Sequence, residues 1–196
     1  MPNNSSIVNR TEEFNIPFGS CHVYYSEWAG GEIPADSAIE TDANRVGYVE
    51  GGCTVNYTME TADLKDDFGK VRRRVLTAED AGFKCQFASW SSSKMGLFTP
   101  TARIVEANGK RKIKIGGLQN DSGKNYLFRL HHPDAEMGDV RITIVGRQQG
   151  GFELAFSPEK ANSMVLDVKA ITSDDEGTLI IYEEEIPSGS SASTPH

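Results

Sequence analysis

Two adjacent histidines are the strongest candidates for metal binding or acid–base chemistry in this sequence. His131 and His132 precede Pro133 and Asp134, and imidazole and carboxylate groups bind metal ions and transfer protons near neutral pH. Neighbouring residues of a β-strand point to opposite faces, so the two rings cannot easily share one metal ion. The favoured interpretation is therefore a strand end before a proline turn, and we predict no metal site.

Other motifs with catalytic potential are weaker. The run Ser122-Gly123-Lys124 is similar to the end of a phosphate-binding loop, but Leu118 stands where that loop needs a glycine, so a hairpin turn is expected. The sequence contains neither a Gly-x-Ser-x-Gly nor a His-Glu-x-x-His motif. Cys85 has no histidine near it in sequence that could activate a thiol nucleophile. We expect no catalytic residue, no cofactor and no enzymatic activity.

The chain contains three cysteines, Cys21, Cys53 and Cys85. Their odd number, and the absence of a Cys-x-x-Cys pair, argue against a disulfide framework and against a zinc site. We therefore expect reduced cysteines that act as small apolar residues on strands.

Composition indicates one acidic domain. The chain has 196 residues, 38% of them hydrophobic, which suffices for one domain with a core. Its formal net charge of -8 makes it a poor candidate for gripping nucleic acid, because phosphate contacts require lysine and arginine. The N-terminus lacks a basic region followed by an apolar run, and no apolar stretch is long enough for a membrane helix, so we expect assembly in a cytoplasm.

The elements that would position any site are β-strands. Val55, Tyr57 and Met59 alternate with Thr54, Asn56 and Thr58, which is typical of a half-buried strand. Further strands are expected at 22–26, 46–49, 53–60, 83–90, 102–105, 112–115, 126–130, 140–145, 152–156, 165–171 and 178–182, with turns at Asn108-Gly109 and 174–177. A serine cap before Met95, Leu97 and Phe98 predicts one short helix at 91–98.

This pattern predicts an all-β fold, a sandwich or small barrel with one short flanking helix. The predicted organisation is an N-terminal arm at 1–14, a β-sandwich domain at 15–186 and a flexible tail at 187–196. Residues 29–45 are expected to form a long loop. Such a fold must protect its open sheet edges, and a ring of copies that pair their edges is one solution.

Residues 61–74 form the most unusual segment. Charge dominates it, Asp66 and Asp67 precede Gly69, and Arg72, Arg73 and Arg74 follow. We predict the tip of a long hairpin, in which Leu64 and Phe68 are isolated apolar residues. A solvated charged loop and a loop that docks on another subunit are both consistent with this pattern.

Three stretches resemble the major tail tube proteins of long-tailed, siphovirus-like bacteriophages. These are Val46-Gly-Tyr-Val-Glu-Gly-Gly-Cys-Thr-Val-Asn-Tyr57, the charged loop 61–74 followed by Thr77-Ala-Glu-Asp80, a strand and a short helix, and the series at 152–160, 165–170 and 175–179. The resemblance extends in order over residues 46–182, and it lies in architecture and local pattern.

The resemblance implies a β-sandwich or barrel subunit that forms hexameric rings, which stack into a tube through which DNA is ejected without specific binding. It also implies contacts with the tape measure, tail terminator and distal tail proteins, and a place in the virion tail. The long loop would contact the neighbouring ring through Asp63, Leu64, Asp66, Asp67, Phe68, Arg72, Arg73 and Arg74, with Leu64 and Phe68 as apolar anchors.

Two alternatives remain open. The same fold serves as the inner tube of a contractile tail or secretion-type injection system, which also needs a sheath. A glycan-binding or host-binding β-sandwich would instead present Tyr25, Trp28, Tyr48 and Trp90 as an exposed aromatic platform. We expect those aromatic residues to lie mostly in a core or an interface.

Overall fold

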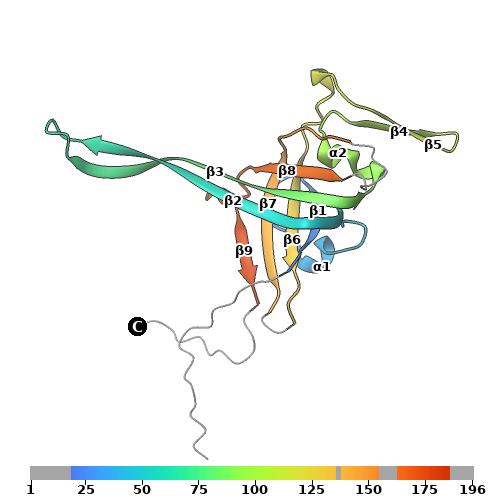
Figure 1. The fold of residues 1–196 in the computed structure, drawn as a ribbon, viewed down its shortest axis with the longest axis horizontal. Helices are drawn as coiled ribbons and strands as arrows, with labels where there is room; N and C mark the ends of the chain where they lie inside the picture. Colours follow the sequence, from blue (N-terminus) through green and yellow to red (C-terminus); the bar gives the residue numbers. More distant parts are fainter. Residues whose placement is uncertain (1–18, 136–137, 155–162, 186–196) are drawn as a thin grey trace, which may run out of the picture.

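The structure, a computed structural model, describes residues 19–135, 138–154 and 163–185. Antiparallel strands dominate it (Figure 1). The strands are β1 (His22–Trp28), β2 (Gly47–Lys65), β3 (Val71–Trp90), β4 (Arg103–Ala107), β5 (Lys110–Lys114), β6 (Asn125–His132), β7 (Val140–Gln148), β8 (Met164–Ala170) and β9 (Ile181–Glu184). The helical turns are α1 (Asp36–Ile39), η1 (Ser92–Lys94), α2 (Met95–Phe98) and η2 (Leu118–Asn120).

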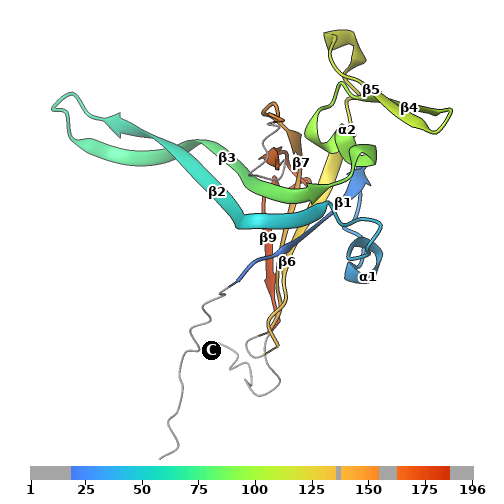
Figure 2. The same cartoon turned by 45° about the vertical axis from the view of Figure 1, so that its right-hand side comes forward.

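One seven-stranded sheet folds over on itself to make two layers. Its order is β1-β6-β7-β8-β3-β2, and β9 also pairs with β7. Strand β7 turns the corner, because Val140–Thr143 pairs with β9 whereas Gly146–Gln148 pairs with β8. As a result, β2, β3 and β8 cross over β1, β6, β7 and β9 (Figures 1 and 2). The β4–β5 hairpin forms a separate two-stranded sheet.

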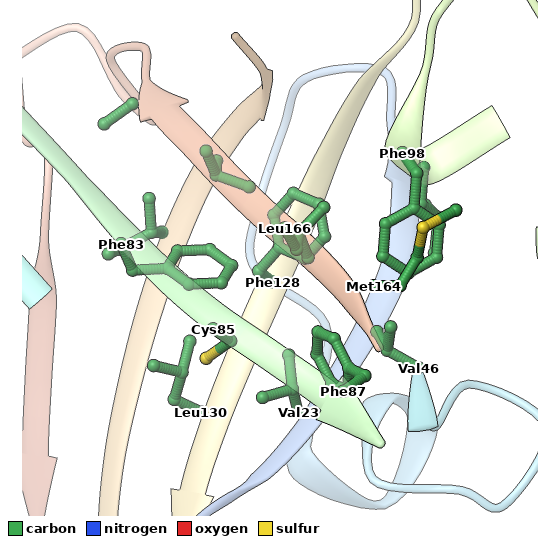
Figure 3. Packing of buried hydrophobic residues seen from close by; sticks show 14 of the residues in the cluster. Val23, Val46, Phe83, Cys85, Phe87, Phe98, Phe128, Leu130, Met164 and Leu166 are labelled. Atoms are coloured by element: carbon green, nitrogen blue, oxygen red, sulfur yellow. The ribbon is translucent and has the colours of Figure 1, made fainter. Parts of the chain in front are cut away.

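The core lies between these two layers (Figure 3). Phe83 from β3 and Phe128 from β6 meet edge to face, with ring centroids 5.2 Å apart. Leu166 from β8 and Val23 from β1 are fully buried in the same cluster. Alternate residues of β8 are buried, as in a half-buried strand, whereas β6 and β7 are also buried on their other face, where Leu127 and Val145 pack with Ile39. The short helix α2 closes one end of the cluster with Met95, Leu97 and Phe98.

The predicted all-β class is confirmed, and so is the short helix at 91–98, which is formed by η1 and α2. The predicted Asn108-Gly109 turn joins β4 to β5 with positive φ angles of 53° and 70°, as a two-residue hairpin turn demands. The turn at Asp174 is also present, with Gly177 N donating to Asp174 O at 3.3 Å.

Several predicted boundaries were wrong. The strand predicted at 152–156 is not formed at Phe152–Leu154, which is irregular, and its remainder lies outside the described residues. The strand predicted at 178–182 begins later, at Ile181. The strands predicted at 46–49 and 53–60 are one strand, β2, with an irregularity between Val49 and Cys53. The predicted arm 1–14 and tail 187–196 lie outside the described residues.

The prediction of three reduced cysteines was wrong for two of them. Cys53 and Cys85 are directly opposite each other on β2 and β3, with Cα atoms 4.4 Å apart, and form a disulfide. That separation lies within the range a disulfide bridges. Cys21 is a free cysteine. The pairing depends on strand register, which the spacing of the cysteines in sequence did not reveal.

The predicted loop 29–45 is held against the sheet by charge. It contains the single turn α1, from which Asp36 accepts a hydrogen bond from Arg129 Nη1 at 2.5 Å. Arg129 is only 2% exposed and also lies 3.6 Å from Glu40 and from Glu183 of β9. Glu40 in turn accepts from Arg141 Nε at 2.9 Å. The buried Arg129 on β6 and the partly buried Arg141 on β7 therefore fix this segment and β9 in place.

The two edges of the large sheet differ. Along β1, the edge is partly covered, because Tyr25 N donates to Asn44 O at 2.9 Å and Val46 N donates to Val23 O at 2.8 Å. Along β2, the outer edge has no strand partner among the described residues, although β2 has 19 residues. The sheet therefore ends on one side in a long edge that is free to pair.

Candidate assembly interface

A two-stranded arm, residues 57–81, projects from the body of the molecule. Strands β2 and β3 continue well beyond the other strands (Figures 1 and 2). The β3–β8 ladder begins at Gly82, opposite Lys169, so beyond it the arm pairs with no further strand of the described chain on either side. At about 3.3 Å per residue, Tyr57–Lys65 reaches about 30 Å from the sheet. A lone two-stranded hairpin is marginally stable in water, so the arm calls for a further contact.

The root of the arm is fixed by close backbone packing. A Cβ atom at Gly82 would lie 2.2 Å from the carbonyl oxygen of Val168, so only glycine lets β3 and β8 approach this closely. Next to it, Lys169 of β8 donates to Asp80 at 3.0 Å. These contacts set the direction in which the arm leaves the sheet.

The tip of the arm is shaped by one side chain. Asp66 Oδ1 accepts hydrogen bonds from the backbone N of Phe68 at 3.1 Å and of Lys70 at 2.8 Å. Its other oxygen accepts from Arg72 Nε at 2.7 Å. An aspartate that binds its own turn in this way closes the loop without any help from the rest of the protein. The turn leaves Phe68 at its apex with 89% of its surface exposed.

A second ion pair stiffens the arm below the tip. Asp63 accepts two hydrogen bonds from Arg74, at 2.7 and 3.1 Å, across the β2–β3 ladder. The Arg74 guanidinium holds the pKa of the Asp63 carboxyl below its usual range, and the carboxylate raises the pKa of Arg74. Both groups are exposed to solvent, so the pair contributes orientation more than stability.

Large apolar side chains on the arm face solvent. Met59 is 61% exposed and Leu76 is 50% exposed, and the complete set is Tyr57, Met59, Leu64, Phe68, Val71 and Leu76. Leu76 lies opposite Thr61, which shares a strand face with Met59. Contiguous exposed apolar residues on a protein mark a contact surface.

The predicted interface residues divide into two groups. Asp63, Asp66, Arg72 and Arg74 pair with one another inside the arm. The remaining four, Leu64, Asp67, Phe68 and Arg73, form no ion pair or side-chain hydrogen bond within the described part of the chain, and Leu64 is 54% exposed. The first group builds the shape that presents the second group to a partner.

Sequence reasoning missed the shaft of the arm. It assigned Tyr57 and Met59 to a half-buried strand, because they alternate with polar residues. The structure places them on the arm, where Tyr57 is 46% exposed and Met59 is 61% exposed. The sequence did carry an indication of solvent exposure, because charged residues continue the same strand at Glu60, Asp63 and Lys65.

A small apolar pocket opens at the end of the sheet opposite α2. Its volume is about 180 Å³, and its lining includes Cys21, Cys53, Val55, Leu130, Ile142 and Tyr182. The Tyr182 hydroxyl donates to Glu184 at 2.9 Å, which places a carboxylate beside the pocket. Burial raises the pKa of the Cys21 thiol to about 11, so this thiol is protonated at neutral pH.

The two histidines have separate structural roles. His131 Nε2 lies 2.8 Å from Asp139 and its Nδ1 lies 3.2 Å from Glu40, whereas His132 Nδ1 lies 2.9 Å from the carbonyl oxygen of Ser20. The hydrogen bond with His131 is the main cause that lowers the pKa of Asp139. Among the residues that the structure describes, no cluster of three or more potential metal ligands occurs. None of the described helices is long and apolar enough to cross a membrane.

The aromatic residues of the proposed glycan platform are scattered. Tyr25 and Trp90 pack against the main core, and Trp28 packs against a smaller cluster around Leu127. Only Tyr48 among them is largely exposed, at 62%. The basic run of β5 lies on an exposed hairpin face, with Ile113 packed against the core.

Comparison with protein-family models and with curated proteins identifies no relative of this chain. No family model matches the chain, and no curated protein matches it in sequence.

Proposed function

We propose that this chain is a structural subunit that assembles into stacked hexameric rings, the tail tube of a long-tailed bacteriophage, through which DNA is ejected. The observation that carries the proposal is the arm at 57–81, a ribbon on which six large apolar side chains are exposed within the described chain: Tyr57, Met59, Leu64, Phe68, Val71 and Leu76. Such a ribbon gains stability when a second subunit buries it. The resemblance of residues 46–182 to tail tube proteins supplies the kind of assembly.

The free edge of β2 supports the same proposal. An unpaired strand edge accepts a strand from another chain through main-chain hydrogen bonds. Copies related by a rotation would join their sheets side by side and leave no free edge in a closed ring. In such a ring, the β2 edge of one copy would meet the other edge of its neighbour, where residues 44–46 cover β1 only in part.

The negative net charge of the chain is compatible with a channel for DNA. With a formal net charge of -8, the subunit repels phosphate instead of binding it, so DNA would slide without specific contacts. The partners in the virion would be further copies together with the tape measure, tail terminator and distal tail proteins. No metal or cofactor is needed for this role.

The disulfide has a consequence for this proposal. A bacterial cytoplasm keeps thiols reduced, so the bond between Cys53 and Cys85 would close after the virion leaves the cell. The β2–β3 ladder already holds the two residues opposite each other. Closure would then lock the root of the arm in a tube that is already assembled.

Electron microscopy of the purified chain at high concentration tests the proposal directly. Tubes of uniform width with an open centre are expected in negative stain. Monomers that persist at every concentration would contradict it. A sheath gene beside this one would assign the tube to a contractile system, and a tape-measure gene without a sheath gene would assign it to a long flexible tail.

A further inference from the structure

We propose that the pocket lined by Cys21, Val55 and Tyr182 receives Phe68 from the arm tip of a second copy of this chain. This inference rests on the proposed function, since it names the place where one subunit holds the next. The two surfaces that it joins, an exposed aromatic ring and an apolar pocket that no described residue fills, lie on the same chain.

The pocket matches a phenyl ring in size and chemistry. Its volume is about 180 Å³, and an apolar cavity of about 150 Å³ is known to bind benzene. Side chains from both layers of the sheet line it, including Val55 of β2, Leu130 of β6 and Ile142 of β7. An aromatic ring that enters would bury apolar surface on the sides that face the pocket wall.

Phe68 is presented for such a contact. It is 89% exposed at the apex of a turn that Asp66 closes through hydrogen bonds of 2.8 and 3.1 Å. Because the turn is fixed before any contact, little further ordering is needed when the ring is buried.

The ring must come from another copy. Val55 lines the pocket at the root of β2, and the strand continues from there to Lys65 as a curved ribbon that leads away from the body (Figure 2). At about 3.3 Å per residue, the tip lies about 30 Å from its own pocket, so it cannot return without breaking the β2–β3 ladder. The same length lets it span the gap to a neighbouring molecule.

Charge supports the match. Three basic residues flank Phe68 and form no ion pair within the described chain: Lys65, Lys70 and Arg73. Asp67 is the one acidic residue at the tip that is also unpaired in the described chain. Beside the pocket, Glu184 follows Tyr182 on β9 and is exposed. A basic tip that approaches an acidic rim is attracted before contact and oriented on arrival.

The geometry of this contact is heterologous, since the tip and the pocket are different surfaces of one chain. Each copy would carry one free tip and one free pocket, so addition continues from copy to copy. Repetition of one such contact produces an extended assembly, as a stack of rings requires.

Cross-linking tests the contact. In the Phe68→Cys variant, the new thiol and Cys21 of the next copy should form a disulfide under copper phenanthroline, which gives a ladder of covalent multimers on a non-reducing gel. Adding Cys21→Ser should remove that ladder. Leu118→Cys is the matched control, because Leu118 is 94% exposed but lies outside the arm; it should yield no product that depends on Cys21. A Phe68→Cys ladder that survives Cys21→Ser would overturn the proposal.

Assembly measurements give an independent test. Phe68→Ala should raise the protein concentration needed for multimers at least about tenfold, from the burial of one aromatic side chain. Val55→Phe, which fills the pocket, should have a similar effect, and the double variant should be no worse than either alone. Glu184→Lys should weaken assembly, and combination with Lys70→Glu should restore it.

The outcomes separate this inference from the proposed function. If Phe68→Ala assembles like the unmodified chain, the inference fails while the tube proposal stands. If the unmodified chain never assembles, the tube proposal fails. A competing occupant is the chain's own segment 14–18, which precedes Gly19 at the pocket. Weaker assembly or folding in Phe18→Ala, with no change in Phe68→Ala, would assign the pocket to that segment.

Discussion

The arm makes one prediction that separates folding from assembly. Replacing Met59 and Leu76 together by threonine should leave the isolated chain about as stable as before and should weaken multimer formation. Both side chains are at least half exposed, at 61% and 50%. Threonine keeps a good strand propensity, so the ladder itself should persist.

The magnitude follows from exposure. Complete burial of a Met or Leu side chain contributes about 1.5–3 kcal/mol, so burying the exposed half of each contributes about 0.8–1.5 kcal/mol. The pair therefore accounts for about 1.5–3 kcal/mol of contact free energy, a change of about tenfold to about 150-fold in the multimerisation concentration. Exposed substitutions change the unfolding free energy by about 0.5 kcal/mol each, so folding should change by about 1 kcal/mol at most.

Two measurements on the same variant check this reasoning. Urea unfolding, followed by the fluorescence of Trp28 and Trp90 in the body, reports folding at concentrations below assembly. Sedimentation velocity over a concentration series reports multimers. Met164→Thr is the matched control, because it makes the same chemical change at a side chain with no exposed surface; it should cost about 2–5 kcal/mol of folding.

Two results would refute the reasoning. A loss of several kcal/mol of folding stability in the Met59→Thr, Leu76→Thr variant would mean that the arm packs against its own chain. Unchanged sedimentation would mean that the shaft of the arm carries no contact.

Three further predictions concern the body of the molecule. Arg129→Ala should lower the unfolding free energy by about 2–4 kcal/mol in urea titrations, because it removes a buried cation that several carboxylates pair with. Arg147→Ala is the control: its ion pair with Asp121 is exposed, so it should cost about 1 kcal/mol or less. Equal losses in the two variants would contradict this difference. Reduction of the Cys53–Cys85 bond should cost about 2–4 kcal/mol, measured by unfolding with and without dithiothreitol, and a Cys53→Ala variant should be indifferent to the reductant. Asp139→Asn should lower the unfolding free energy by about 1–2 kcal/mol at neutral pH. The folded pKa of Asp139 lies below its ordinary 3.8, so its stabilisation is present above about pH 4 and is lost as pH falls through the lowered pKa. The unfolding free energies of the wild type and the variant should therefore converge in acid.

Local patterns in the sequence predicted local structure well. The Asn108-Gly109 turn, the turn at Asp174 and the Ser91 cap of the short helix each depend on a few neighbouring residues. Their conformational preferences act over one turn, so no knowledge of distant contacts is needed.

Contacts between distant residues were not accessible in the same way. Asp36 meets Arg129, 93 residues away, and this pairing orders a segment that reads as a loop. The Cys53–Cys85 bond depends on the register of β2 against β3, which the residues between Val49 and Cys53 shift. A one-residue change in register would move every side chain to the other face, and the pattern alone does not locate such shifts.

The arm was predicted in part. The charged segment 61–74 was correctly placed at a hairpin, but the strands continue through most of it, and only 66–70 form the turn. Charged residues are compatible with a strand when neither face is buried. Polarity therefore indicated solvent exposure at Asp63 and Arg74, and strand pairing decided their backbone conformation.

The irregularity of β2 at Glu50–Gly52 limits aggregation through the unpaired edge of the sheet. Gly51 and Gly52 have φ angles of 76° and 84°, and three residues of β2 stand opposite Gln86 alone. Glycine tolerates this backbone, and the interruption divides the free rim of β2 into two shorter pieces that do not run in one line. An unrelated chain that paired with one piece of the edge would be out of register with the other piece. Non-specific fibril growth is therefore disfavoured, whereas a neighbour with a matching edge can still pair.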